Sequence, residues 1–558
     1  LKVVVVGAVR AGKTSLIRGM MEEKPCLCRD DDRTKGVDVH MSTPVKASHK
    51  AKLEMIFWDF AGHSEYYSTH QLFLSKGALY LLVVDIKRFA EEPLESRGDL
   101  IFVWLDALLS RVPECNLLVV ATQIDKLDGD NLYTLKNNLE NAVRDHLETK
   151  KKEHRRAMVR QNTGSVVESA TLVFHGVVTV SGAERPSLLS LRKTLDELVM
   201  HKRYLFPCMR PNIPVSWARA SAVLHAKCMG LNPIMEAWRV KPKGRYISPR
   251  LPQESLDYLT WEQASAIWGN VVRVLKLEQE TGDADDVLKQ AAIMLQVNQG
   301  MFLQSSGLLY LDPAWINKLL RAILDHDLRD PEKESFWVSE MQQFTDQHVS
   351  ATFCDLKGTH DTFCFTGTLT AGYLRFLWRD IIPTETNLSG ELFEHSLNTM
   401  SQHGVIFESS DNQAGGITSN RKLEDNTSLF VPVLLAPKVV ETDLRHCETQ
   451  SEYQYRKDLI FEIYQSYVPP GLLGLLVADF KSVDNVRLDA CWSRGACFTM
   501  GGPVVLLHLD AVSEGKNVKA IIEANIFGQK QSGELFRAVE TVERTIKSLL
   551  GVRYPGLD

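Results

Sequence analysis

A strand-like apolar run that leads directly into a glycine-rich loop is the feature that most constrains this chain. The run "KVVVV" is followed by "GAVRAGKT", which fits the pattern G-x-x-x-x-G-K-[ST]. In this pattern backbone N–H groups surround a β-phosphate, the lysine reaches the β and γ oxygens, and the last hydroxyl binds Mg²⁺. An apparent helix follows, and its positive N-terminal end favours the same phosphates. The sequence therefore predicts a phosphate site formed by Gly7, Ala8, Val9, Arg10, Ala11, Gly12, Lys13, Thr14 and Ser15.

Further strand-like runs recur through the first two hundred residues, with helix-compatible stretches between most of them. Continuous apolar strands that alternate with helices indicate an α/β domain with a parallel sheet covered on both faces. Ligands of such sheets bind at the carboxyl ends of the strands. The polar residues that follow the strands are therefore the informative ones. The runs are "LEMIFWD" (53–59), "ALYLLVVDI" (78–86), "NLLVVATQID" (116–125) and "GVVTVS" (176–181).

One of these strands ends in "WDFAG", which supplies the pattern D-x-x-G. Asp59 is predicted to hold Mg²⁺, and the N–H group of Gly62 to meet a γ-phosphate, as in P-loop NTPases. Thr34 lies where the switch threonine of a GTPase closes over the metal and the γ-phosphate. The predicted Mg²⁺ ligands are Thr14, Thr34 and Asp59.

The motif "TQID" indicates which base is bound. GTPases usually carry N-K-x-D, whose aspartate accepts hydrogen bonds from N1–H and N2–H₂ of guanine, groups that adenine does not offer in the same way. Here Asp125 is retained, whereas Thr122 and Gln123 replace the asparagine and the lysine. Ser181 is predicted to stand where GTPases place a backbone contact to the guanine oxygen. GTP and GDP are the predicted ligands, and an ATPase is disfavoured.

With "TKGVD", "DFAGH" and "TQID" in one chain, the segment resembles the Roc (Ras of complex) GTPase domain of the ROCO family. Later stretches, among them "LLYLDPAWINKLLRAI" and "FEIYQSYVPPGLLGLLVADF", look like the COR domain that follows Roc in that family. "VRAGKT" and "FLSKGALYLLVV" are most similar to the kinase-lacking branch typified by malignant fibrous histiocytoma amplified sequence proteins. The resemblance implies a Ras-like fold and a COR region that forms dimers and contacts the Roc switch regions.

Three domains are expected: a Roc GTPase domain at 1–203, an N-terminal COR subdomain at 204–436 and a C-terminal COR subdomain at 437–558. The proline-containing stretch "YLFPCMRPNIP" marks the first boundary, because it breaks a helical pattern. Two helical stretches followed by a short apolar strand predict a winged-helix-like first half of COR. The end of the chain predicts an α+β part closed by an amphipathic helix, "GELFRAVETVERTIKSLL".

Hydrolysis needs a positioned water and a cation for the charge of the transition state. His63 stands where Ras-like proteins carry glutamine, and the sequence leaves a water-positioning role and a packing role equally open. Arg33 is the predicted arginine finger, with Arg10 and Arg29 as alternatives, although each on its own is an ordinary loop arginine. Val9 replaces a glycine of Ras and crowds the catalytic residue, so slow hydrolysis is expected. The predicted catalytic residues are Lys13, Arg33, Thr34 and His63.

Composition bounds the partners and the compartment. The net charge of -6 argues against nucleic acid, and the one dense basic run, "KKKEHRRAMVR", is predicted to be a solvated helix face, with a membrane surface or a partner as the alternative. The ten cysteines show no C-x-x-C pair, which indicates reduced thiols and a cytoplasmic protein. No apolar run reaches the roughly 20 residues of a membrane span.

Two functions of different class follow. In the first, the chain is a slow GTPase whose nucleotide state is coupled to COR-mediated dimerisation or to binding of other signalling proteins. In the second, it is a GTP-stabilised scaffold with negligible hydrolysis. The chain opens on a strand without an initiator methionine and is expected to be a fragment of a longer protein.

Overall fold

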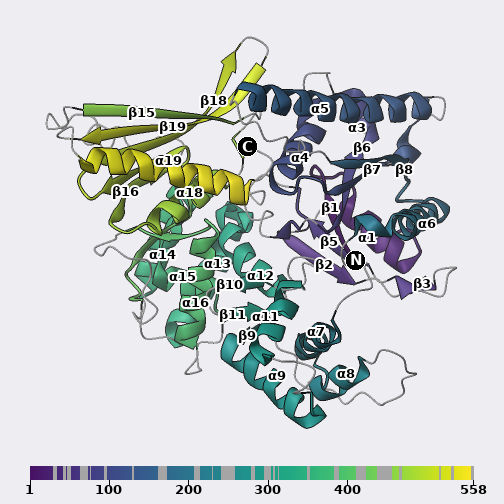
Figure 1. Ribbon diagram of the computed structural model, residues 1–558, viewed down its shortest axis with the longest axis horizontal. Coiled ribbons are helices and arrows are strands. Elements are labelled where there is room, and N and C mark those ends of the chain that lie inside the picture. Colours follow the sequence, from purple (N-terminus) through teal and green to yellow (C-terminus); the bar gives the residue numbers. More distant parts are fainter. Residues whose placement is uncertain are drawn as a thin grey trace. The chain divides into compact units, whose positions relative to one another are not determined.

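The computed structural model divides the chain into two compact units, one built mainly from Leu1–His63 and Phe73–Lys318, the other from Leu319–Asp558 (Figure 1). The division falls inside helix α12 (Pro313–Leu324). The structure describes residues 1–28, 34, 36–41, 45–46, 52–53, 55–62, 73–75, 77–92, 97–127, 131–160, 172–206, 214–228, 230–240, 258–277, 283–294, 303–305, 308–311, 313–347, 352–382, 389–409, 423–435, 455–463, 468–469, 471–514, 517–528 and 533–554.

A six-stranded sheet forms the centre of the first unit, in the order β2-β5-β1-β6-β7-β8. All neighbouring strands run parallel except β2, which pairs antiparallel with β5 at the edge. The central strands are buried along their length, which explains why they read as continuous apolar runs. The predicted α/β fold with a parallel-rich sheet is confirmed. The strands are β1 (Lys2–Val6), β2 (Val37–Met41), β5 (Ile56–Phe60), β6 (Leu79–Asp85), β7 (Asn116–Thr122) and β8 (Val173–Thr179).

Helices cover both faces of this sheet (Figure 1). Helix α1 packs with α6 on one face, where Leu16 and Ile17 meet Leu188 and Leu191 in a common core. Helices α4 and α5 pack together and against strands β6 and β8. The helices are α1 (Lys13–Glu22), α3 (Ile86–Glu91), α4 (Arg97–Arg111), α5 (Leu132–Arg160) and α6 (Arg185–His201), with 3₁₀ turns η4 (Ile124–Lys126) and η6 (Arg203–Leu205) and a small hairpin of β3 (Val45–Lys46) and β4 (Lys52–Leu53).

The remainder of the first unit combines helices with a small antiparallel sheet of order β10-β11-β9. Its core surrounds the fully buried Trp268. Helix α9 begins with a capping box, since Thr260 and Gln263 bond each other's backbone N–H groups. These are the elements of the predicted winged-helix-like half of COR. They are α7 (Val215–Cys228), α8 (Pro233–Arg239), β9 (Tyr258–Thr260), α9 (Trp261–Leu275), α11 (Ala284–Met294), β10 (Leu303–Ser305) and β11 (Leu308–Tyr310).

The first part of the second unit is mainly helical, with a short antiparallel sheet of order β12-β14-β13. The fully buried Trp378 is tied to helix α12, because its indole N–H donates to the carbonyl of Leu319 at 3.1 Å. The elements after α12 are η9 (His326–Arg329), η10 (Pro331–Lys333), α13 (Glu334–Gln347), α14 (Phe353–Thr366), β12 (Thr368–Thr370), α15 (Ala371–Leu377), α16 (Ser389–Gln402), β13 (Phe407–Glu408), β14 (Ser428–Phe430) and η11 (Pro432–Leu434).

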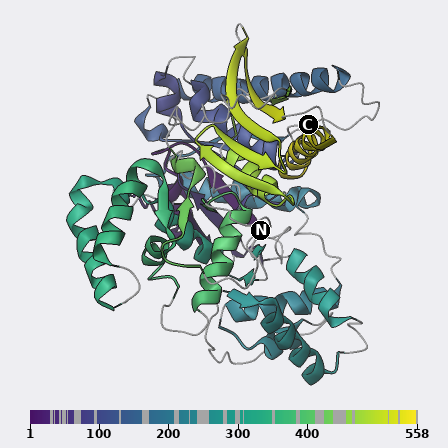
Figure 2. The ribbon, with the colours of Figure 1, turned by 90° about the vertical axis from the view of Figure 1, so that its left-hand side faces the viewer.

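The second unit ends in a five-stranded antiparallel sheet of order β15-β19-β18-β17-β16. Figure 2 shows these strands with the yellow helix α19 beside them, and α18 and α19 share one core with the sheet. In the last helix Leu535, Val542, Ile546 and Leu549 are buried, as its spacing predicts, whereas Val539 is only partly buried. The elements are β15 (Tyr455–Ile463), α18 (Leu472–Lys481), β16 (Val486–Trp492), β17 (Gly495–Met500), β18 (Val504–Glu514), β19 (Asn517–Gly528) and α19 (Gly533–Arg553).

Two glycines of the second unit bring α18 against the turn that follows α16. A Cβ atom on Gly404 would lie 2.5 Å from the carbonyl carbon of Gly474, and one on Gly474 would overlap the carbonyl oxygen of Gly404. Gly404 also has a φ of 76°, which disfavours other residues. The two backbones are therefore in direct contact.

The predicted domain boundaries stay predictions. The boundary at 203/204 falls in the 3₁₀ turn η6, whereas 436/437 falls outside the described residues. No helix in the described part of the chain is long and apolar enough to cross a membrane.

Candidate nucleotide-binding site

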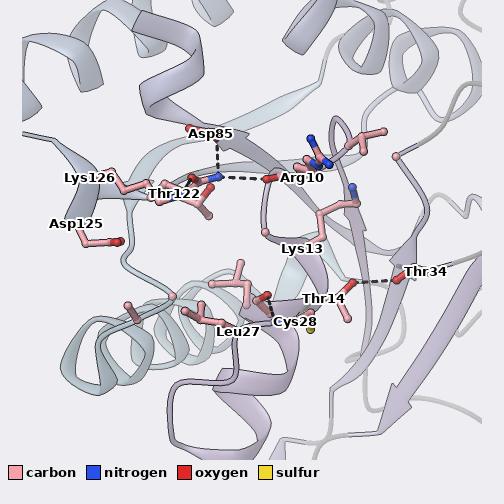
Figure 3. Close-up of a pocket in the computed structure, with 18 of the residues that line it drawn as sticks. Arg10, Lys13, Thr14, Leu27, Cys28, Thr34, Asp85, Thr122, Asp125 and Lys126 are labelled. Atoms are coloured by element: carbon pink, nitrogen blue, oxygen red, sulfur yellow. Dashed lines mark hydrogen bonds between the residues drawn. The ribbon is translucent and has the colours of Figure 1, made fainter. Parts of the chain in front are cut away.

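A pocket of about 540 Å³ lies in the first unit, among the loops that follow β1, β6 and β7. Figure 3 shows Thr14 and Thr34 at one end of it and Asp125 and Lys126 at the other. Its volume is within the usual range for a small-molecule site, roughly 300–1,000 Å³. The lining residues are Val9, Arg10, Gly12, Lys13, Thr14, Ser15, Leu16, Leu27, Cys28, Thr34, Ala61, Gly62, Asp85, Thr122, Gln123, Asp125, Lys126, Gly182 and Ala183.

The glycine-rich loop connects β1 to α1 and holds Lys13 in place. The Lys13 ammonium donates to the carbonyl oxygens of Gly7 and Ala8, each at 2.9 Å. Burial lowers the pKa of Lys13 to about 8, and the Asp59 carboxylate opposes that change. A bound phosphate would favour the charged form, because an opposite charge nearby raises the pKa of an ammonium. The loop therefore presents a positioned cation at the N-terminus of a helix, as its sequence predicts.

Three side-chain oxygens meet at the phosphate end of the pocket. The hydroxyls of Thr14 and Thr34 donate to Asp59 Oδ2 at 2.6 and 2.9 Å, and the two hydroxyl oxygens are 2.9 Å apart. Asp59 is fully buried, and burial raises its pKa, while the hydrogen bond from Thr14 and the charge of Lys13 oppose the rise. Its Oδ1 atom is buried, and no hydrogen-bond partner for it lies among the described residues.

This oxygen cluster fits a hard cation. Mg²⁺ prefers oxygen ligands and is usually held by one or two carboxylates together with phosphates and waters. One carboxylate and two hydroxyls satisfy that preference, and a cation would also give the buried Oδ1 side of Asp59 a partner. No group of three or more His, Cys, Asp and Glu side chains that could hold a metal occurs in the described part of the chain.

Gly62 follows β5 and packs directly against the phosphate loop. A Cβ atom at this position would lie 2.5 Å from the backbone nitrogen of Val9 and 2.7 Å from the carbonyl carbon of Ala8. Contacts this short do not occur, so a side chain at residue 62 would push the two loops apart. The glycine of the D-x-x-G motif is thus placed beside the predicted γ-phosphate position.

The base end of the pocket is connected to the phosphate loop through "TQID". The buried Thr122 hydroxyl lies 2.7 Å from the carbonyl oxygen of Ala11 and 3.2 Å from that of Val84. The Gln123 amide donates to the carbonyl of Arg10 at 3.1 Å. Two consecutive residues of this motif therefore bind two consecutive carbonyls of the phosphate loop.

Asp125 lines the pocket and is positioned from behind by Ser181. The Ser181 hydroxyl donates to Asp125 Oδ1 at 2.8 Å, and the backbone N–H of Ser181 donates to Ser187 Oγ at 2.9 Å. Ser181 itself is completely buried, and Gly182 and Ala183 form the lining beside Asp125. The backbone N–H of Ser181 is thus occupied by Ser187, and the predicted contact of Ser181 to the guanine oxygen stays a prediction.

The structure brings most of the predicted site residues together. Five of them lie behind the lining and form hydrogen bonds with residues of the lining: Gly7, Ala8, Ala11, Asp59 and Ser181. His63 and Arg33, together with the alternative Arg29, lie outside the described residues, so their roles stay predictions.

The prediction missed Asp85 and Lys126, although Asp85 ends a strand and Lys126 follows the motif aspartate. Nothing in the sequence points to Leu27 or Cys28.

A parallel sheet with an antiparallel edge, a phosphate loop with its lysine and an aspartate loop at the base end define a Ras-like P-loop GTPase domain. Residues 2–125 match the family described as "Ras of Complex, Roc, domain of DAPkinase". The chain is 24% identical over 249 residues to a malignant fibrous histiocytoma-amplified sequence 1 homolog of Xenopus tropicalis, covering 39% of this chain and 24% of that protein. This alignment is longer than the Roc segment.

A second relative is a Roc-COR-CHAT protease of an unknown prokaryotic organism, 33% identical over 89 residues, which cover 15% of this chain and 8% of that protein. A GDP-bound Roco2 RocCOR structure of Methanosarcina barkeri covers 78% of this chain and 95% of its own, at 17% identity and a TM-score of 0.42. The chain is thus similar to Roc-COR proteins of the ROCO family, with the Roc family match itself confined to residues 2–125. It spans between 4% and 24% of the length of the curated relatives it matches.

Proposed function

We propose that this chain is a slow, Mg²⁺-dependent GTPase whose nucleotide state is passed from the Roc switch residues to the COR region. Lys13 neutralises charge on the β- and γ-phosphates, and Asp125 selects guanine. Thr14, Thr34 and Asp59 hold Mg²⁺, which supplies charge neutralisation at the β- and γ-oxygens when it is bound. Gly62 senses the γ-phosphate from the other side. Thr34 and Gly62 lose their contact with the γ-phosphate after hydrolysis, as in other nucleotide switches.

The observation that carries the coupling is a bidentate contact between Asn317 and Val37. The Val37 N–H donates to Asn317 Oδ1 at 3.0 Å, and Asn317 Nδ2 donates to the Val37 carbonyl. Val37 begins the edge strand β2, only three residues after Thr34. Asn317 is 4% exposed. Its amide completes the edge of the sheet as a neighbouring strand would, so a displacement of the Thr34 segment has to strain or break this contact.

Asn317 lies on helix α12, inside which the division between the two compact units falls. The carbonyl of Leu319, two residues further along, accepts the indole N–H of Trp378. One helix therefore carries a bond to the switch strand and a bond to the core of the second unit. This continuity supports a mechanical connection from nucleotide to COR.

Replacing Asn317 with leucine is expected to weaken that connection. The backbone groups of Val37 would lose both partners in a buried place, at a cost of about 1–3 kcal/mol for each unsatisfied group. We expect faster amide hydrogen exchange over residues 37–41 and a smaller difference in exchange of α12 between GDP and a non-hydrolysable GTP analogue. Lys318→Ala, which changes the adjacent exposed residue, is the matched control. Equal nucleotide-dependent exchange in Asn317→Leu and wild type would contradict the coupling.

Single-turnover GTP hydrolysis by the purified chain tests the enzymatic part. We expect slow turnover that disappears in His63→Ala and persists in His201→Ala, a variant of an exposed histidine at the end of α6. Native mass should be recorded in GDP and in the non-hydrolysable analogue. Binding without turnover and with constant mass would instead favour a GTP-stabilised scaffold.

A change of mass between nucleotides would support the rest of the proposal, which is that COR forms a homodimer and presents surfaces to other signalling proteins in the cytoplasm. The predicted basic run lies in α5, where a solvated helix face remains the first interpretation and contact with a membrane surface the alternative. Nucleic acid is not among the proposed partners.

A further inference from the structure

The departure from N-K-x-D creates a network that the motif alone does not predict. Gln123 adopts a left-handed backbone conformation with a φ of 61°. Its amide nitrogen donates to Asp85 Oδ2 at 2.6 Å and to the Arg10 carbonyl at 3.1 Å. Its amide oxygen accepts the ammonium of Lys126 at 2.6 Å. Both donors and an acceptor of one side chain are therefore occupied.

The partners of Gln123 are themselves fixed. Asp85 caps helix α3, because its Oδ1 accepts the N–H groups of Lys87 and Arg88 at 3.1 Å each. Arg10 also has a left-handed conformation, with a φ of 64°. A non-glycine residue is uncommon in this region and persists when its surroundings hold it there. Gln123 thus ties the phosphate loop to the start of α3 and leaves its carbonyl oxygen directed at Lys126.

Lys126 lies next to the base-selecting aspartate and lines the same end of the pocket, as Figure 3 shows. Its hydrocarbon stem can pack on an apolar ring face while its ammonium stays bonded to an amide oxygen. A lysine at position 123 would direct its cation at Asp85. With glutamine at position 123, the positive charge lies three residues later, on Lys126 at the rim of the pocket.

We propose that Gln123 and Lys126 together replace the motif lysine. Gln123 positions the loops. Lys126 packs its stem on the guanine, and its ammonium supplies the positive charge that the motif lysine would carry. This inference rests on the proposed guanine-nucleotide site. Lys126 is a nucleotide-contacting specificity residue, and Gln123 is a positioning residue that acts through Lys126 and Arg10.

The test is the dissociation constant of a fluorescent GDP derivative for single and double variants of the whole chain. Gln123→Ala and Lys126→Ala should each weaken binding about tenfold, because either change removes the positioned Lys126 stem from the base. The double variant should lose no more than the weaker-binding single variant, since the two residues act as a unit. Lys289→Ala, which removes an exposed lysine outside the pocket, should bind as wild type does.

The relocation variant Gln123→Lys with Lys126→Ala should recover affinity to within about threefold of wild type, because it restores a cation at the motif position. A purely structural role for Gln123 would not produce this rescue. Lys126 is exposed, so Lys126→Ala keeps the proposal testable even if Gln123→Ala does not fold. Wild-type affinity in Lys126→Ala, additive losses or absence of rescue would each overturn the inference. Failure of the wild-type chain to bind GDP would overturn the guanine-nucleotide site itself.

Discussion

Replacing Lys13 with alanine is expected to lower the affinity of the chain for GTP and GDP by roughly 30- to 3,000-fold, the usual range for losing one member of a buried charged pair. The Gly7 and Ala8 carbonyls already hold the Lys13 ammonium. In the described part of the chain this leaves one of its three N–H bonds for phosphate oxygens. The lysine is therefore positioned before the nucleotide arrives, and alanine removes both the charge and the organiser of the loop.

Isothermal titration with GDP and with a non-hydrolysable GTP analogue measures this loss. Lys24→Ala is the matched control, since Lys24 is an exposed lysine just beyond α1 that pairs with Glu22 at 3.1 Å. The control should bind both nucleotides as wild type does. Unchanged affinity in Lys13→Ala would refute the phosphate assignment for the whole loop.

Asp125→Asn is expected to exchange the base preference of the site. Aspartate accepts two hydrogen bonds from guanine, whereas asparagine offers one acceptor and one donor, which suit the N1–H and the C2 carbonyl of xanthine. We expect the affinity for GDP to fall by at least about 100-fold, since each lost bond to a charged group is worth about 1.5–3 kcal/mol. The affinity for xanthosine diphosphate should rise.

This exchange is measured by letting GDP and xanthosine diphosphate compete with the fluorescent GDP derivative for the site. Ser181→Ala serves for comparison, because it removes the hydroxyl that donates to Asp125 at 2.8 Å but leaves the carboxylate in place. It should reduce GDP affinity less and keep the preference for guanine. Retained selectivity for GDP in Asp125→Asn would place base recognition elsewhere.

The parts of the site that the sequence predicts are those specified by short continuous segments. The phosphate loop needs its glycines, Lys13 and Thr14 within eight residues of one strand end. The parallel sheet is predicted because strands buried on both faces are apolar throughout. Asp59 is found because it lies near the end of such a strand and Asp125 because it follows one, and the ends of parallel strands meet at the same edge of the sheet.

The rest depends on contacts that join distant segments. Asn317 is separated from Val37 by 280 residues, and an asparagine on an amphipathic helix carries no signal of that contact. The antiparallel pairing of β2 with β5 is not specified by apolar patterning. Lys126 gains its meaning only through Gln123, whose replacement of lysine reads in isolation as a weakened motif.

The direct contact between Gly404 and Gly474 has a mechanical consequence. At these two glycines the turn after α16 and helix α18 touch through backbone atoms, so no side chain lies between them at that point. The turn after α16 is therefore held rigidly against α18, which shares a core with the five-stranded sheet. A rotation of α16 is therefore expected to move α18 and the sheet as well. A methyl group added at either glycine would push the two segments apart and change the angle between them.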